Sequence, residues 1–173
     1  SQGSDPAYMK LVFMEQALKD HMYDLKNAPR SHIVFENEEV EKSNEFSKNL
    51  PLLDVAVDTF GLKVSTYNGR EKSAHGWYVR GKTIALGVQN VCTFAHELVH
   101  AADDKLGNLK ERGQHWRSET VAELGGAILL RAIGLPENAD IGGCWEYISK
   151  YATDNQIEPL EACYKVLHRT QQA

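Results

Sequence analysis

The chain has 173 residues, of which 42% are hydrophobic and 25% charged, with a formal net charge of −5. This size and composition predict a globular protein with a sizeable core. The acidic balance and the lack of a long basic run give no support for nucleic-acid binding by this chain. No apolar run reaches the length of a membrane span, and the N-terminus lacks a signal-peptide core, so we predict no membrane association.

The cysteines are odd in number and form no C-x-x-C pair: Cys92, Cys144 and Cys163. Such a set predicts reduced thiols and a cytoplasmic protein. The chain begins Ser1-Gln2-Gly3-Ser4 without a methionine, which we interpret as residues left from cloning or as the trimmed end of a longer protein. The oligomeric state has no signature in the sequence.

Residues 1–49 are predicted to form an N-terminal helical extension. Asp5 can cap a helix and Pro6 suits its first position, and apolar residues then recur at helical spacing, which predicts a helix over 6–26. Residues 36–48 carry five glutamates and few apolar residues, so we expect a solvated helix or a connection there. The second predicted domain covers residues 50–173.

A small sheet is predicted at the start of this second domain. The apolar segment 50–60 ends at Gly61, a helix C-cap. Three short strand-like runs follow, at 62–67, 76–79 and 83–86, and the last two flank Arg80-Gly81-Lys82 as a hairpin connection. We therefore expect a mainly antiparallel sheet of about three strands.

The next predicted helix, from the cap Asn90 to about Asp104, contains the pattern H-E-x-x-H over His96 to His100. Residues four apart share a helix face, so His96 and His100 can direct two imidazoles at one point. Glu97 lies one position round the helix, where a carboxylate reaches a water at that point. The pattern is typical of two nitrogen ligands to Zn²⁺ with an adjacent general base. The plainer alternative is two surface histidines on an amphipathic helix.

A catalytic zinc usually has three protein ligands, so a third is needed. The metzincin pattern requires a glycine at position 103 and a histidine at 106, but Asp103 and Leu106 stand there. Eighteen residues separate His100 from Glu119, a spacing at which gluzincins place a glutamate from a second helix. Glu123 lies one helical turn further and can accept a hydrogen bond from a ligand histidine.

The helix bearing Glu119 is predicted over about 114–133, with Gly125-Gly126 in its middle. Each glycine costs about 1 kcal/mol relative to alanine, so we expect a close approach of this helix to the H-E-x-x-H helix. Two further helices are predicted, over 141–151 and 159–168.

Together these features resemble the metallopeptidase domain of ArdC-like antirestriction and polyvalent proteins of plasmids and phages. The resemblance covers roughly residues 50–165 and rests on four stretches: Thr93–Ala101, Glu119–Ala127, Gly134-Leu135 and Tyr147-Ile148. It implies an α+β, zincin-like metalloprotease fold, with zinc held by His96, His100 and Glu119, and Glu97 as general base in an intracellular setting. Residues 1–49 do not match the single-stranded-DNA-binding domain of ArdC-type proteins, so DNA binding is not carried over.

We therefore predict a zinc metallopeptidase that hydrolyses protein or peptide substrates. A donor to the oxyanion is still required, and Tyr147 is our choice over Tyr151 and His115, although each also suits a structural role. One alternative is a SprT-like protease of DNA-associated proteins with His115 as third ligand. Another is a metal-stabilised interaction module that cleaves nothing, against which the presence of Glu97 argues.

Overall fold

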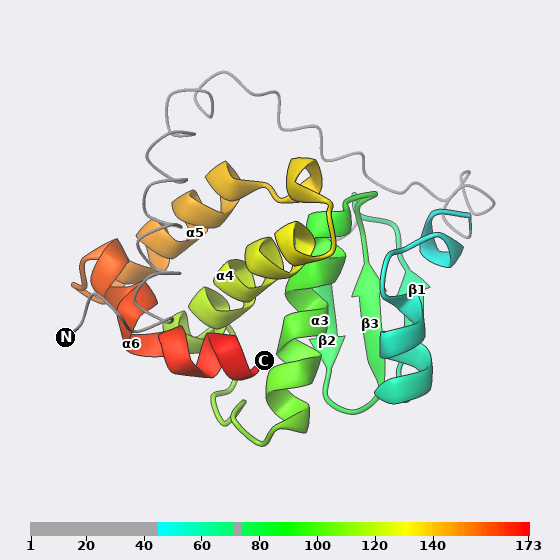
Figure 1. Cartoon of the computed structure of the whole chain (residues 1–173), viewed down its shortest axis with the longest axis horizontal. Helices are drawn as coiled ribbons and strands as arrows, with labels where there is room; N and C mark the ends of the chain where they lie inside the picture. Colours follow the sequence, from blue (N-terminus) through cyan, green and yellow to red (C-terminus); the bar gives the residue numbers. More distant parts are fainter. Residues whose placement is uncertain (1–44, 71–73) are drawn as a thin grey trace.

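The computed structural model describes residues 45–70 and 74–173. The helix predicted over 6–26 and most of the segment 36–48 lie outside the described residues, so the predicted boundary near residue 50 stays a prediction. In the described part, a small sheet lies on one side of helix α3, and the helices α4, α5 and α6 lie on the other (Figure 1). The architecture is therefore α+β, as the sequence predicted.

The sheet has three short strands, β1 (Lys63–Thr66), β2 (Gly76–Val79) and β3 (Thr83–Leu86), in the order β1-β3-β2. The predicted hairpin is confirmed, since β2 pairs with β3 antiparallel. The prediction of a mainly antiparallel sheet is wrong for β1, which pairs with β3 in parallel. Strand β1 lies beyond β3 instead of beside β2, and apolar alternation along a strand does not encode which neighbour it takes. Strand β2 is therefore an edge strand next to α3.

A short π-helix, η3 (Val55–Thr59), precedes the sheet. The predicted cap at Gly61 is confirmed, because this glycine has φ +68° and its N–H donates to the carbonyl of Val57 at 3.1 Å. The chain then enters β1. Ile84 and Leu86 of β3 pack with Phe94 and Leu98 of α3 in a shared hydrophobic cluster. This cluster fixes α3 against the sheet.

Helix α3 (Val91–Lys105) begins after Asn90, whose side chain accepts a hydrogen bond from the Cys92 N–H, as predicted. Helix α4 (Trp116–Ala132) crosses it on the side away from the sheet. The 3₁₀ turn η4 (Pro136–Asn138) leads to α5 (Ile141–Asp154) and α6 (Pro159–Gln172). Both last helices extend three or four residues beyond their predicted ends.

The predicted close approach of α4 to α3 is confirmed at both glycines. A Cβ on Gly126 would lie 3.2 Å from the backbone nitrogen of His96, and one on Gly125 would lie 2.9 Å from a methyl group of Val99. The glycines therefore let the backbone of α4 contact the backbone of α3 at the first histidine of the motif. This contact sets the distance at which side chains of α4 meet those of α3.

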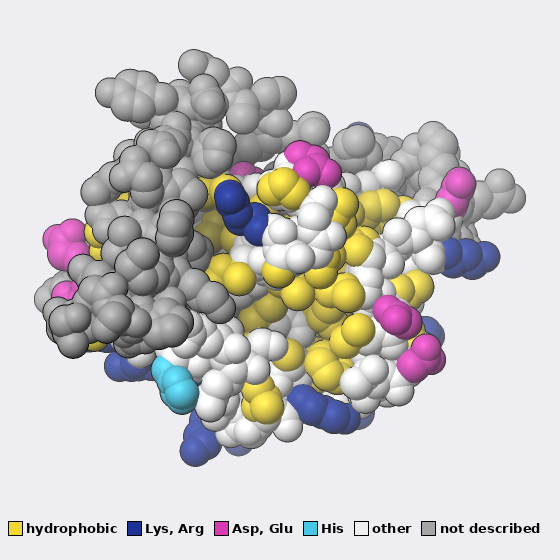
Figure 2. Space-filling view, in the orientation of Figure 1, with side chains coloured by type: hydrophobic (Ala, Val, Ile, Leu, Met, Phe, Trp, Pro, Cys, Tyr) yellow, Lys and Arg dark blue, Asp and Glu magenta, His cyan; other side chains and the backbone are white. Residues whose placement is uncertain are grey.

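Hydrophobic side chains gather in the middle of the face drawn in Figure 2, and most charged side chains lie at its edge. None of the described helices combines the length and the apolar character needed to span a membrane.

Candidate metal centre

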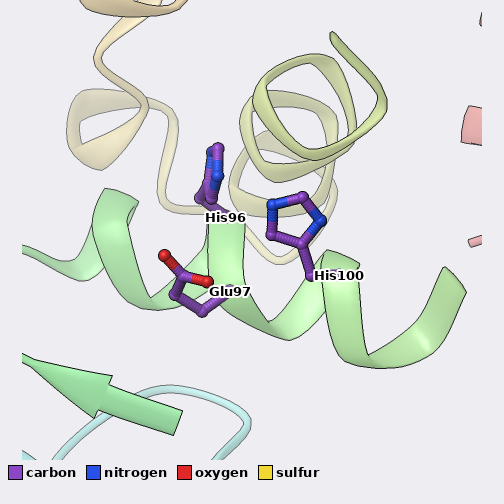
Figure 3. A group of neighbouring side chains, drawn as sticks. All are labelled: His96, Glu97 and His100. Carbon is purple, nitrogen blue, oxygen red and sulfur yellow. The ribbon is translucent and has the colours of Figure 1, made fainter. Parts of the chain in front are cut away.

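His96 and His100 extend from one face of α3 toward α4, and Glu97 projects beside them on the side of the sheet (Figure 3). The two imidazole rings are 4.7 Å apart between centroids and nearly perpendicular, at 83°. Ligand atoms of His96, Glu97 and His100 all lie within 4.8 Å of one another, so this group could hold a metal ion. The shared helix face predicted from the sequence is therefore present.

Helix α4 brings the carboxylate of Glu119 onto both histidines. Its Oε2 lies 3.3 Å from Nε2 of His96, and its Oε1 lies 3.4 Å from Nε2 of His100. Ligands bound at 2.0–2.1 Å to a tetrahedral zinc are themselves about 3.3 Å apart. Each histidine thus lies at such a distance from one oxygen of Glu119, while the ligand atoms that form the compact group within 4.8 Å are those of His96, Glu97 and His100.

Glu123, one turn further along α4, contacts the other ring nitrogen of His96. Its Oε1 lies 2.8 Å from Nδ1, an ion-pair distance whose alignment is not that of a regular hydrogen bond. This contact occupies Nδ1 and leaves Nε2 directed at Glu119, as expected for an outer carboxylate that orients a ligand histidine. Nδ1 of His100 is buried without a hydrogen-bond partner among the described residues.

The carboxylates dominate the electrostatics of this cluster. Burial disfavours a charged His96, but Glu123 and Glu119 outweigh it and raise the pKa of His96 well above its usual value. Burial also opposes ionisation of Glu119, yet contacts with His100 and His96 lower the pKa of Glu119 to about 2. The cluster therefore attracts positive charge, which either a proton on His96 or a metal cation supplies.

Glu97 is a buried carboxyl group, 6% exposed, and burial raises its pKa. Gly76 is the first residue of β2. A Cβ at this position would lie 3.3 Å from Oε1 of Glu97 and 2.9 Å from Cγ2 of Thr93. A glycine at this position therefore lets the edge strand pack directly against the carboxyl group. The sequence predicted Gly76 only as part of a strand. Its contact with Glu97 joins two elements that are separate in the sequence, so no local pattern indicates it.

Two cavities open on either side of these residues, of about 310 Å³ and 370 Å³. Both are lined by the same five residues: Gly76, His96, Glu97, Gln114 and Glu119. Two of the candidate metal ligands, His96 and Glu119, thus line both cavities, and His100 lines the 370 Å³ cavity. Gln114 had no sequence signal, because a lone polar residue before a helix is usual for a helix start.

The candidate oxyanion donors lie in different places. Tyr147 and Tyr151 of α5 line the 310 Å³ cavity together with His96 and Glu119, and their rings stack 6.5 Å apart. Tyr147 is 41% exposed, whereas Tyr151 is half-buried, and burial followed by the charge of Glu119 raises the pKa of Tyr151. Both tyrosines are therefore within the candidate site.

His115 has a structural role at the start of α4. It is the N-cap residue, and its Nδ1 accepts a hydrogen bond from the backbone N–H of Arg117 at 3.2 Å. It does not line either of the two cavities among the residues that the structure describes. The geometry therefore favours Glu119 over His115 as the group that faces the histidines.

The three cysteines are all free thiols, and Cys92 and Cys144 line the 310 Å³ cavity.

Comparisons with known proteins found no matching family model, curated protein or solved structure. The resemblance to ArdC-like metallopeptidases therefore stays a prediction from sequence motifs, and the site must be argued from its own geometry.

Proposed function

We propose that this protein is a zinc-dependent metallopeptidase that hydrolyses peptide bonds in protein or peptide substrates. The observation that carries the proposal is the convergence of the Glu119 carboxylate on both Nε2 atoms, at 3.3 and 3.4 Å, with Glu97 beside them. Two imidazoles and one carboxylate form a donor set suited to zinc, and the base next to them distinguishes a catalytic from a structural site.

A zinc ion held by His96, His100 and Glu119 would polarise a substrate carbonyl and lower the pKa of a water molecule toward neutrality. Glu97 would take a proton from that water and donate it to the leaving amine. Burial raises the pKa of Glu97, which makes its carboxylate a stronger base for accepting a proton. The phenol of Tyr147 or Tyr151 is available to donate to the developing oxyanion from the same cavity.

The two cavities supply room for substrate on both sides of the site. Among the described strands β2 lies at the edge of the sheet, and its residues Gly76, Trp77 and Tyr78 line the 370 Å³ cavity. An extended peptide could add to this edge through backbone hydrogen bonds. Two cavities that share five lining residues leave space for substrate beyond the reacting residues, which supports cleavage within a chain over the removal of a terminal residue.

The test is the zinc content and the proteolytic activity of wild type and three variants: Glu97→Gln, Glu119→Ala and His115→Ala. Wild type should bind one zinc and cleave an unstructured protein. Glu97→Gln should keep its zinc and lose about 10²- to 10⁴-fold in rate, the usual contribution of a general base. Glu119→Ala should lose zinc, while His115→Ala should retain it and lose about 1 kcal/mol of stability through the missing cap.

Loss of zinc in His115→Ala, with zinc retained in Glu119→Ala, would replace the proposed third ligand by His115. Wild type that binds no stoichiometric metal would overturn the enzyme proposal. Zinc binding without cleavage of any protein would leave a metal-stabilised module and would also contradict it.

A further inference from the structure

The segment between α3 and α4 forms one wall of the candidate cleft. Leu109, Glu111, Arg112, Gly113 and Gln114 all line the 370 Å³ cavity, and Gln114 also lines the other cavity. The segment has no helix or strand of its own. It is bracketed by Gly107 and Gly113, which have φ +78° and +65°, conformations that other residues rarely adopt. Something other than secondary structure must hold this wall in place.

The start of the segment is held by α3, because the N–H groups of Asn108 and Leu109 donate to the carbonyl of Asp103 at 3.0 and 3.3 Å. Its middle is held at Glu111. The carboxylate of Glu111 accepts two hydrogen bonds from the guanidinium of Arg169 on α6, at 2.7 and 2.9 Å. Its backbone carbonyl accepts a hydrogen bond from Nη2 of Arg80, in the β2–β3 hairpin, at 2.8 Å. Elements from two separate parts of the chain thus hold one residue, by its side chain and by its backbone.

Arg169 is itself fixed by a second carboxylate. Its Nε and Nη2 donate to Asp103 of α3 at 2.6 to 3.0 Å, and Asp103 is completely buried. A planar guanidinium with five donors can serve two carboxylates at once, which a lysine cannot. Arg169 keeps the pKa of Glu111 low, at about 2, so Glu111 is ionised at neutral pH. We call the ion pair of Arg169 with Glu111 the clamp.

We propose that Arg169 is a positioning residue: through Glu111 it holds the 108–114 segment, and with it Gln114, as the wall of the substrate cleft. The inference rests on the proposed peptidase function, since a wall needs a substrate. Arg169 lies on the last helix and does not line either cavity among the described residues, so it reaches the cavity wall through Glu111, while its contact with Asp103 fixes it to α3. Release of the clamp should weaken substrate binding and leave the metal ligands unchanged.

The clean variant is Glu111→Gln, because it removes the charge of the clamp and leaves Arg169 paired with buried Asp103. Arg169→Lys is the conservative partner, since it keeps a cation for Asp103 and loses the fork that reaches Glu111. The matched control is Glu161→Gln, which removes the carboxylate of an exposed ion pair on the same helix, 2.9 Å from Lys165. That pair lies apart from both cavities.

Two measurements are made on each full-length, zinc-loaded variant: amide hydrogen exchange over 108–114, and kcat and KM on a peptide substrate. Glu111→Gln and Arg169→Lys should both exchange about tenfold faster in this segment, and both should raise KM about fivefold with kcat and zinc content nearly unchanged. Glu161→Gln should match wild type in every measurement.

The inference is overturned if exchange over 108–114 is the same in Glu111→Gln and wild type, or if KM is unchanged while exchange rises. A fall in kcat with zinc loss would also overturn it, because the clamp would then support the metal ligands and not the cleft wall. Failure of the proposed function looks different: wild type itself would cleave nothing. The exchange measurement would still decide whether Arg169 holds the segment.

Discussion

Two buried charge clusters lie one turn apart on α3, and they differ in the source of their positive charge. Around Asp103, the chain supplies its own cation, and Arg169 contacts Asp103 and Glu111 at distances of 2.6 to 3.0 Å. Around His96 and His100, the ion-pair partners of Glu119 and Glu123 within the described residues are the histidines themselves. The first cluster is complete, because an arginine of the chain neutralises its carboxylates. The second cluster is incomplete, because an added cation would further stabilise its carboxylates.

This difference separates a cluster that stabilises the fold from one that is suited to binding a metal. A buried carboxylate paired with an arginine fixes two elements together. Separating the elements would leave a buried charge without its partner, at a large cost in free energy. The carboxylates around His96 and His100 have spare capacity for positive charge, and a catalytic metal site requires such capacity. The three predictions below test each half of the comparison.

The largest expected effect comes from removing the cation of the complete cluster. Arg169→Met leaves the carboxylate of Asp103 buried and unpaired, so the free energy of unfolding should fall by about 3–5 kcal/mol. Urea denaturation of the zinc-loaded protein measures this loss. The control Lys165→Met, which breaks an exposed ion pair on the same helix, should lose less than about 1 kcal/mol. Equal stability of the two variants would show that Asp103 does not depend on Arg169.

The next effect concerns the incomplete cluster. Glu123→Ala removes the carboxylate that contacts Nδ1 of His96, so the ring is no longer oriented toward Glu119. Zinc affinity should fall by about 10- to 100-fold, the usual result of losing such an outer carboxylate. Competition with a zinc-binding dye measures the affinity. The control is Glu137→Ala, an exposed acidic residue in η4, which should leave the affinity unchanged. An unchanged affinity in Glu123→Ala would remove Glu123 from the site.

The two clusters also differ in how far the sequence predicted them. His96, Glu97 and His100 were evident from one helical turn, and Glu119 and Glu123 from a second helix with the same four-residue spacing. Local periodicity encodes such pairs, and Gly125-Gly126 marked where the two helices would meet. Asp103 was noted only because it excluded the metzincin pattern. Its partner Arg169 is 66 residues away, and a contact at that separation leaves no local pattern.

The same limit explains the errors in the fold. Strand positions, the hairpin and the capping residues Asn90 and Gly61 depend on neighbours in sequence, and they were predicted within one or two residues. The parallel pairing of β1 with β3 depends on which side of the hairpin β1 joins, and the local pattern of β1 does not encode that side. His115 was a candidate ligand by spacing, but the start of α4 requires a cap, and its ring accepts that backbone hydrogen bond instead.

The smallest expected effect is a pH dependence of stability that arises from Glu111, the less buried carboxylate of the complete cluster. The side-chain hydrogen bond with Arg169 lowers the pKa of Glu111 from 4.5 to about 2, so its ionised form stabilises the fold. A lowered pKa gives a contribution that is fully present above pH 4.5 and is lost as the pH falls toward 2. Glu111→Gln should therefore be less stable than wild type by about 1 kcal/mol at pH 7, because the pair is partly screened by solvent.

This difference should stay constant down to about pH 5 and then shrink as Glu111 itself is protonated. Denaturant titrations of both proteins at a series of pH values measure it, in the presence of chelator so that loss of metal at low pH does not enter. Glu161→Gln serves as the control, with a small difference from wild type at pH 7. A gap between wild type and Glu111→Gln that widened on acidification would have the wrong sign, and the charged pair with Arg169 would then not be what stabilises this wall of the cleft.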